Sequence, residues 1–315
     1  MTNWKKKLHY WTQREILAYS KRAYKYIKKL MQIKKYDVTH AFFGIPSGAI
    51  AYLFKKEIPY VVSLRGSDVP GFNKRFSLQY VFLKPIIKKI WSEASAVISN
   101  SAGLKQLALK TSPNQEIGII YNGVDINKFK PIEEKNNEIF TILCVARLIE
   151  RKGIDYLINA IPLVLEKQRD VRLILVGEGN LENELKKLCK DLDLEEYVLF
   201  KGRVEHDDLP DLYSSSDVFV LPSKNEGMSN TVLEAMASGL PIITTDTGGT
   251  QELIKDNGIV VHVEDSKTIA SAILHLADDY SLCKTMGTIS RKIADGLSWK
   301  KVAENYLEIY KKVTG

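Results

Sequence analysis

The chain has 315 residues, of which 45% are hydrophobic, and a formal net charge of +7 at pH 7. This length and composition exclude a disordered chain and favour two globular domains. No window reaches the run of about 18–20 apolar residues that a membrane-spanning helix needs, and the three cysteines show no metal-ligand spacing. We therefore expect a protein of the reducing cytoplasm.

The positive charge is concentrated at the start of the chain. Residues 1–37 hold eleven Lys/Arg against two acidic residues, a balance of +9, so the remainder sums to −2. Within this segment apolar residues recur at helical spacing: Ile16, Tyr19, Ala23, Ile27 and Leu30. Two interpretations remain open, a surface helix packed on a sheet and a helix on an anionic membrane surface. Nucleic-acid binding is not expected, because no recognised module accompanies the charge.

Short β-branched runs alternate with helical patterns from residue 37 onward. Strands are predicted at 37–43, 59–64, 96–99 and 117–121. Helical patterns lie between them, one through Tyr52 and Leu53 and another over 80–91. This alternation predicts βαβ units and a parallel sheet.

A charged, aperiodic stretch at 127–138 is predicted to link two domains. After it, strands are predicted at 141–145, 172–176, 198–200, 218–221, 241–244 and 258–261, and a last helix at 299–312. The expected architecture is two Rossmann-like α/β domains with parallel sheets, at 1–126 and 139–297, followed by a helix at 298–315. We expect the first domain to be incomplete, because four strands precede the linker where a doubly wound domain commonly has about six.

Two glutamates bracket the segment that follows the strand at 218–221. Glu226 lies in a polar loop, and Glu234 follows inside a helix that begins near Thr231, which Ser229 and Asn230 can cap. Backbone N–H groups converge at this helix N-terminus, where an anion is favoured; they belong to Gly227, Met228, Ser229, Asn230 and Thr231. Two carboxylates beside an anion site suit a sugar attached to a phosphate. The alternative is a loop charge and a helix-face charge without a ligand.

A cationic site is predicted after the strand at 141–145. Arg147 directly follows that strand, at the edge where open α/β sheets bind ligands, and Lys152 precedes the next helix. The two can neutralise a diphosphate, although a solvated basic turn is the alternative. No HExxH motif or Cys/His spacing occurs, so no metal site is predicted. A leaving phosphate would then rely on these cations and on backbone dipoles.

Three further positions are candidates for ligand contact. The turn at Arg203 and Val204 could enclose a nucleobase with its backbone, whereas His206 is expected to start a helix rather than to catalyse. His40 lies inside a predicted strand, where a core histidine and a reactive one are both plausible. Asp68, on a turn at a strand's end, is the better candidate for a cleft.

Taken together, these motifs resemble retaining glycosyltransferases of the group 1 type, glycosyltransferase family 4, which have the two-domain GT-B fold. The resemblance runs from about residue 37 to the end, and four segments contribute most to it: 63–71, 122–125, 146–153 and 226–241. It implies that Arg147 and Lys152 bind a donor diphosphate and that Glu226 contacts the sugar. It also implies that the backbone after Gly227 holds sugar and phosphate, that Glu234 binds the ribose, and that the last helix crosses back to the first domain.

The resemblance implies a metal-independent enzyme with front-face attack, a UDP- or GDP-sugar as donor and a lipid-linked or polysaccharide acceptor. The candidate residues for the acceptor side are His40, Arg65 and Asp68. Three departures from the family concern this side. No glycine-rich loop follows the first strand, Arg65 stands where many members have His, and the second His of a frequent His-x-His is replaced in the run His40-Ala41-Phe42. Two alternatives remain, a donor-binding protein without turnover and another GT-B enzyme such as an epimerase or a phosphorylase. The expected place of work is cell-envelope synthesis at the inner face of the plasma membrane.

Overall fold

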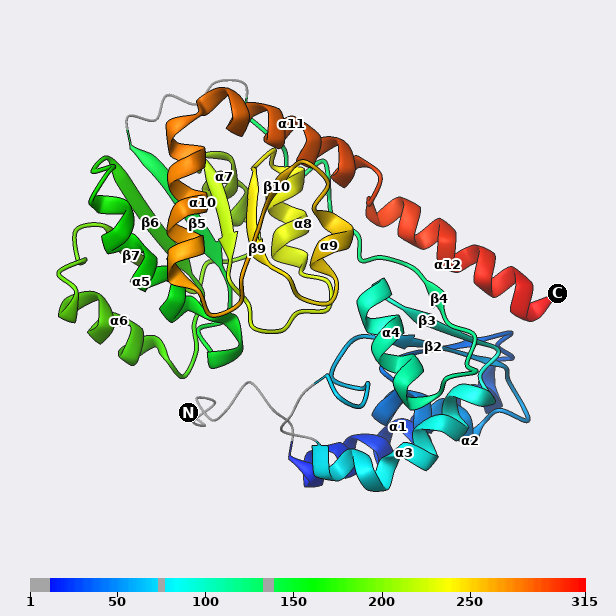
Figure 1. Ribbon diagram of the computed structural model, residues 1–315. Helices are drawn as coiled ribbons and strands as arrows, with labels where there is room; N and C mark the ends of the chain where they lie inside the picture. Colours follow the sequence, from blue (N-terminus) through cyan, green and yellow to red (C-terminus); the bar gives the residue numbers. More distant parts are fainter. Residues whose placement is uncertain (1–11, 73–76, 133–138) are drawn as a thin grey trace. The chain divides into compact units, whose positions relative to one another are not determined.

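The computed structural model describes residues 12–72, 77–132 and 139–315 (Figure 1). Part of the basic segment (1–11) and part of the predicted linker (133–138) thus lie outside the described residues. The described chain divides into two compact units. Unit 1 contains the residues up to Asn100, Leu104–Ile119 and Tyr306–Gly315, and unit 2 contains Ser101–Gly103 and Ile120–Asn305.

Unit 1 is built on a four-stranded parallel sheet in the order β1-β2-β3-β4. Its strands are β1 (Thr39–Phe42), β2 (Tyr60–Leu64), β3 (Ala96–Ser99) and β4 (Gly118–Ile119), which confirms the predicted parallel pairing. The connections contain η1 (Gly44–Gly48), α2 (Ala49–Leu53), α3 (Ser77–Ser92) and α4 (Ala102–Thr111). Right-handed crossovers that advance in one direction place their helices on a single face of the sheet. Val62 and Leu64 of the sheet and Trp91 of α3 lie in the core of this unit.

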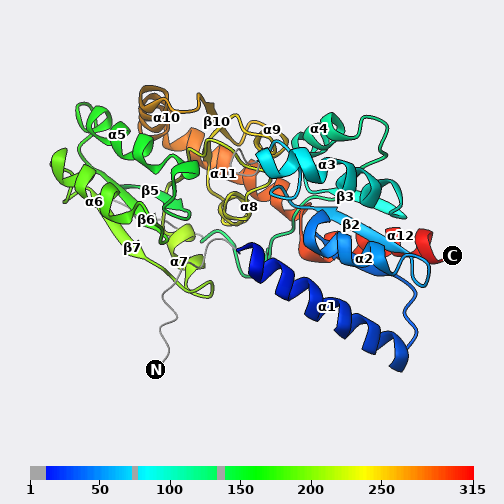
Figure 2. The same cartoon turned by 90° about the horizontal axis from the view of Figure 1, so that it is seen from below.

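The basic segment forms α1 (Gln13–Ile33), which begins at a capping box between Thr12 and Glu15. A half-buried stripe on α1 packs against α2 and the turn after it, where Ala23, Ile27 and Met31 meet Ile50, Phe54 and Ile58. The helix runs beside α2 in Figure 2. Of the two interpretations left open, the first expected the helix to pack on a sheet; α1 packs instead on α2 and the turn after it.

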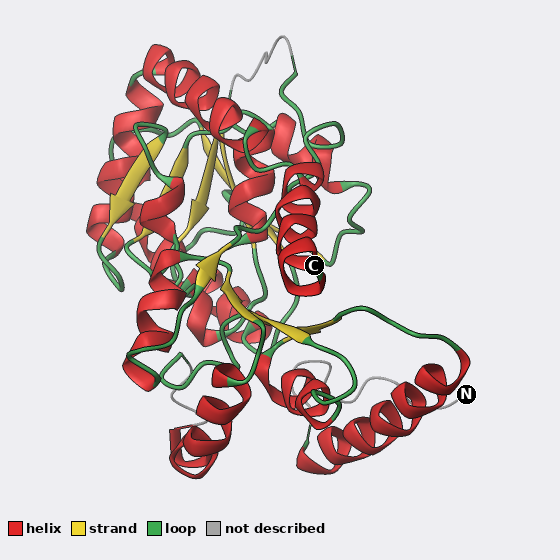
Figure 3. Ribbon diagram, turned by 90° about the vertical axis from the view of Figure 1, so that its right-hand side faces the viewer, coloured by secondary structure: helices red, strands yellow, loops and turns green. Residues whose placement is uncertain are grey.

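Unit 2 is a six-stranded parallel sheet in the order β10-β9-β8-β5-β6-β7, with helices on both sides (Figure 3). The strands are β5 (Phe140–Val145), β6 (Val171–Val176), β7 (Val198–Gly202), β8 (Val218–Leu221), β9 (Ile242–Thr245) and β10 (Gly258–Val261). All four residues of β8 and of β9 are buried, as expected for strands covered on both faces. The strand order reverses between β5 and β8, and such a switch point is where doubly wound folds bind ligands.

The helices of unit 2 are η3 (Glu150–Lys152), α5 (Ile154–Leu165), α6 (Glu182–Asp191), α7 (Leu209–Ser214), α8 (Asn230–Ala237), α9 (Thr250–Leu253), α10 (Ser266–Asp278) and α11 (Tyr280–Asp295). The last helix, α12 (Trp299–Thr314), contributes its first part to unit 2 and its last part, from Tyr306, to unit 1. The predicted fold class, two parallel-sheet α/β units, is confirmed. No helix in the described part of the chain is both long and apolar enough to cross a bilayer.

Candidate active site

The switch point of unit 2 brings the turn after β5 against the loop after β8. Gly153 follows η3 with a φ of 62°, and a Cβ at this position would lie 2.3 Å from the carbonyl oxygen of Pro222. Only glycine permits both the left-handed backbone and this approach. The two segments that were predicted to bind the diphosphate and the sugar are therefore neighbours.

An ion cluster forms where these two segments meet. The ammonium of Lys152 pairs with the carboxylate of Glu226, and Arg151 Nη1 lies 3.8 Å from the other carboxylate oxygen. Arg151 also donates to the carbonyl of Asn225 at 2.8 Å. Burial opposes ionisation of Glu226, but Lys152 and Arg151 outweigh it and hold the pKa of this carboxyl below its usual value. Glu226 is thus an ionised carboxylate held by two cations.

Arg147 differs from Lys152 in its surroundings. Its side chain is exposed at the end of β5, and it forms no ion pair with any residue that the structure describes. Lys152, in contrast, is buried. Arg147 thus differs from Lys152 in both burial and ion pairing. Arg151, which sequence reasoning left without a role, lies one position before Lys152 in the same turn.

The loop after Glu226 leads into α8 without a side-chain cap. Ser229 occupies the predicted N-cap position, but its side chain accepts no capping hydrogen bond, and its hydroxyl instead lies 3.0 Å from that of Thr231. The prediction that a side chain caps this helix is therefore corrected. The first N–H groups of α8 therefore receive no capping hydrogen bond from the side chain of Ser229.

The side chain of Asn122 holds the loop after Glu226 through hydrogen bonds. Its side-chain amide donates to Asn230 Oδ1 at 2.9 Å and to the carbonyl of Met228 at 3.4 Å. A Cβ on the neighbouring Gly123 would lie 2.7 Å from the ring of Trp299. The motif at 122–125 was noticed in the sequence, but its part in holding residues 228–230 was not, because the contact spans more than 100 residues.

Glu234 lies on α8 with a side chain that is 12% exposed. Tyr213 donates its hydroxyl to Glu234 Oε2 at 2.9 Å, and His206 Nε2 lies 3.2 Å from Oε1. Burial raises the pKa of Glu234, and these two hydrogen bonds oppose that rise. His206 lies in the turn before α7, near the predicted helix start, but its ring reaches across to Glu234, which the sequence did not indicate.

The turn after β7 holds the other predicted nucleotide residues. Val204 is half-buried, and Arg203 is exposed with its Nε 3.3 Å from Glu205 Oε1. The two ends of the predicted donor site are thus the ion cluster at Glu226 and the carboxylate at Glu234. Along the chain, the loop residues 227–229 and the first turn of α8 lie between them.

The predicted acceptor-side residues lie in unit 1. His40 Nδ1 lies 2.6 Å from the hydroxyl of Tyr310 and Nε2 lies 2.7 Å from Ser63 Oγ. The Tyr306 hydroxyl contacts Ser63 Oγ at 2.9 Å and accepts from Arg65 Nη2 at 3.3 Å. Burial and the nearby Arg65 guanidinium lower the pKa of His40 to about 4, so the imidazole is neutral at pH 7. Both ring nitrogens are engaged by the protein itself, and His40 serves here to seat the end of α12.

Asp68 is 4% exposed, in the core of unit 1. Its carboxylate accepts from the backbone N–H groups of Gly44 at 2.7 Å, Arg65 at 2.9 Å and Gly66 at 3.0 Å. Burial raises the pKa of Asp68, and the backbone donors oppose that rise. We assign this carboxylate a structural part, that of holding the turn after β2, instead of the predicted position in a cleft.

A comparison with known protein families finds a match that covers most of unit 2. The profile described as "Glycosyl transferases group 1" matches residues 125–293, more than half of the chain. This chain belongs to the group 1 glycosyl transferases. A second profile, described as "Glycosyltransferase Family 4", matches residues 5–128 of the transferase. The predicted family and the predicted enzyme class are thereby confirmed.

Relatives of the transferase cover most of its length. An uncharacterised glycosyltransferase of Methanocaldococcus jannaschii is 30% identical over 303 residues, which cover 90% of this chain and 77% of that protein. The UDP-Gal:alpha-D-GlcNAc-diphosphoundecaprenol alpha-1,3-galactosyltransferase of Escherichia coli is 28% identical over 307 residues, with the same coverages of 90% and 77%. The solved sucrose-phosphate synthase of Thermosynechococcus elongatus has a TM-score of 0.82 at 22% identity and covers 97% of this transferase and 81% of that chain. At that identity the likeness shows a shared fold.

Proposed function

We propose that this transferase moves a sugar from a UDP- or GDP-sugar to a lipid-linked or polysaccharide acceptor, with retention and without a metal. The observation that supports this most is the combination in unit 2 of a cation-held carboxylate, Glu226, with a second carboxylate, Glu234, across the N-terminus of α8. A nucleotide sugar needs both ends, because its ribose offers hydroxyl donors and its diphosphate requires positive charge.

In this proposal each predicted residue has one task. Arg147 and Lys152 neutralise the diphosphate, and the N–H groups of residues 227–230 hold its oxygens and the sugar. Glu226 accepts hydrogen bonds from sugar hydroxyls. Glu234 accepts from the ribose, and the backbone at 203–204 faces the base. Lys152 already pairs with Glu226. The carboxylate that would bind the sugar and the ammonium that would bind the phosphate are therefore in position before the donor binds.

The proposed reaction breaks the bond between the sugar's anomeric carbon and the phosphate oxygen. The acceptor hydroxyl attacks from the same face, and the leaving phosphate oxygen takes its proton, so configuration is retained. Negative charge grows on the diphosphate as that bond lengthens. Arg147, Lys152 and the helix N-terminus stabilise this charge, which is the contribution that accelerates the reaction.

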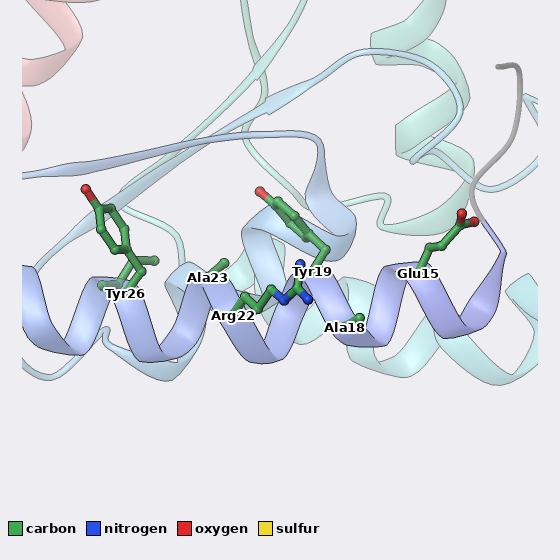
Figure 4. Close-up of a pocket in the computed structure, with 7 residues that line it drawn as sticks. Glu15, Ala18, Tyr19, Arg22, Ala23 and Tyr26 are labelled. Carbon is green, nitrogen blue, oxygen red and sulfur yellow. The ribbon is translucent and has the colours of Figure 1, made fainter. Parts of the chain in front are cut away.

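For the acceptor we propose a lipid-linked glycan at an anionic membrane surface. The relative from Escherichia coli acts on a diphosphoundecaprenol-linked sugar, as its name says. Helix α1 has six Lys/Arg against one Glu, a net charge of +5, and no buried residue. Glu15, Tyr19 and Tyr26 project from the same side of α1 and line a groove of about 910 Å³ (Figure 4). A basic helix with exposed apolar side chains suits a membrane interface.

Calorimetric titration with UDP and with GDP tests the donor site. We expect one of the two to bind, and Glu234→Ala to weaken that binding at least about tenfold, because a carboxylate that accepts from ribose hydroxyls is lost. Glu184→Ala, an exposed carboxylate on α6, is the control and should leave the affinity unchanged. If neither nucleotide binds, or if Glu234→Ala binds as tightly as the parent, the proposed donor site is wrong.

Sedimentation with vesicles tests the membrane proposal. We expect the protein to sediment with phosphatidylglycerol vesicles and not with phosphatidylcholine ones. Replacing Lys21, Arg22 and Lys25 with Gln should lower the partition at least about tenfold, because each basic side chain near an anionic surface contributes about 1 kcal/mol. Replacing three lysines of α6, at positions 186, 187 and 190, is the matched control. Equal binding to both kinds of vesicle would contradict a charge-driven contact.

A further inference from the structure

We propose that Lys128 and His206 act as a positioning pair for Glu234, so that residues 125–129 belong to the nucleotide site instead of serving only as a connection. This inference rests on the proposed function of Glu234 as the ribose ligand. Neither Lys128 nor His206 was assigned to the site from the sequence. Lys128 lies in the predicted linker, and His206 was expected to start a helix.

The contacts form a chain of three side chains. Lys128 Nζ lies 2.8 Å from His206 Nδ1, and His206 Nε2 lies 3.2 Å from Glu234 Oε1. Asp207 Oδ1 lies 2.5 Å from the same ammonium. These contacts join residues that are 78 and 28 positions apart in the chain. They end on one oxygen of the carboxylate, while Tyr213 donates to the other.

The ammonium determines which nitrogen of His206 has the proton. A lysine ammonium has three donors and no acceptor, so the nitrogen that faces it must accept. A neutral imidazole that accepts at Nδ1 holds its proton at Nε2, and this N–H then donates to Glu234. Lys128, which must donate to Nδ1, and Glu234, which accepts from Nε2, therefore select the same tautomer. Without the ammonium, Nδ1 no longer has to accept, so the ring can hold a proton there.

A buried aromatic ring orients both donors to Glu234. Phe129 is 1% exposed, and its ring meets those of His206 and Tyr213 edge-on, with centroids 5.3 and 5.6 Å apart. Such edge-to-face contacts favour a defined ring orientation. The residue that follows Lys128 in the chain thus fixes the two rings that hold Glu234.

The segment that supplies Lys128 and Phe129 is itself anchored. Asp125 Oδ1 accepts from the N–H groups of Asn127 at 3.0 Å and Lys128 at 3.1 Å. From α11, Arg291 donates to the carbonyls of Phe129 at 3.0 Å, Ile126 at 3.1 Å and Ala237, at the end of α8, at 2.8 Å. This guanidinium joins the segment to the helix on which Glu234 lies. The position of Lys128 is therefore tied to that of Glu234 through the backbone as well.

The test compares nucleotides with and without ribose hydroxyls. Calorimetric titrations would use whichever of UDP and GDP binds the parent, together with its 2′,3′-dideoxy form. His206→Ala should weaken binding of the ribonucleotide about fivefold, the effect of one hydrogen bond at a largely exposed ring. The dideoxy form should lose less than about twofold. His206→Gln, whose amide can donate in place of Nε2, should restore ribonucleotide binding, and His262→Ala is the histidine control beyond β10.

A second measurement reads the tautomer directly. Nitrogen-15 spectra of the histidine rings should show His206 protonated at Nε2 in the parent, and Lys128→Met should increase the Nδ1-protonated form. Lys130→Met, two residues further along the chain, should leave the spectrum unchanged. Equal losses for ribose and dideoxy nucleotides with His206→Ala, no loss for either, or a parent ring protonated at Nδ1 would each overturn the inference. The donor-site proposal fails separately, when Glu234→Ala binds ribonucleotide as the parent does.

Discussion

Replacing Lys152 with methionine is expected to slow cleavage of the bond between the donor sugar and its nucleotide by about 10²–10³-fold. The ammonium of Lys152 is the buried cation of the ion cluster, and in the proposed reaction it stabilises the charge that grows on the leaving diphosphate. Removing one preorganised donor to a developing anion costs rates of this order. The measurement is the rate at which the nucleotide is released from the donor. The donor used is the sugar of whichever nucleotide, UDP or GDP, binds in the titration.

Loss of charge stabilisation must be separated from loss of folding. Lys152→Met leaves the carboxylate of Glu226 with Arg151 at 3.8 Å as its remaining partner in the cluster, which should lower the thermal midpoint. The double variant Lys152→Met/Glu226→Gln removes the carboxylate that has lost its nearest cation, so it should recover stability. Its turnover should stay low, because both residues belong to the proposed site. Lys224→Met, on the loop that carries Glu226 but paired with Glu264, is the control. If the double variant recovered turnover, Lys152 would be a structural residue only.

Gly249→Ala is expected to abolish donor binding. A Cβ on Gly249 would lie 1.7 Å from the carbonyl oxygen of Gly227, the residue that follows Glu226 in the loop after β8. Because the obstructing atom belongs to the backbone, the whole loop must move, and overpacking of this kind destabilises on the order of 3 kcal/mol. We expect nucleotide affinity to fall at least about a hundredfold and the thermal midpoint to decrease.

The control for this variant is Gly296→Ala, at the end of α11. Its new Cβ would lie 3.3 Å from the carbonyl oxygen of Ile293, a contact that small adjustments relieve. Gly296→Ala should therefore bind nucleotide as the parent does. Unchanged binding by Gly249→Ala would mean that the position of Gly227 does not matter for the donor, contrary to the proposed site.

Much of the fold could be read from local patterns. The predicted strands at 96–99, 218–221 and 258–261 have the bounds of β3, β8 and β10. Alternation of such strands with helices also indicated parallel sheets, which the structure has in both units. These features depend on neighbouring residues along the chain, since periodicity and turn residues specify strands and helices locally.

The contacts of individual side chains were harder to predict from the sequence. His206 was expected to be a helix-start residue, and it does lie before α7, but its ring reaches Glu234. His40 was left open between a core and a chemical part, and its hydrogen-bond partner Tyr310 comes from the last helix, 270 residues away. Ser229 took the predicted cap position without making the cap hydrogen bond. Rotamers and distant neighbours decide such contacts, and no local pattern encodes them.

The sequence by itself determined most elements of this protein and its family, and it supports the proposed donor site, because strand ends, glycine turns and the spacing of Glu226 and Glu234 are local properties. The tertiary structure alone decided which side chains hold these groups. Lys152 meets Glu226 across 74 residues, and Lys128 meets His206 across 78, because sheet order and helix packing bring their turns together. It also decided that α1 packs on α2, since burial of Ala23, Ile27 and Met31 depends on which apolar surface the fold presents to them.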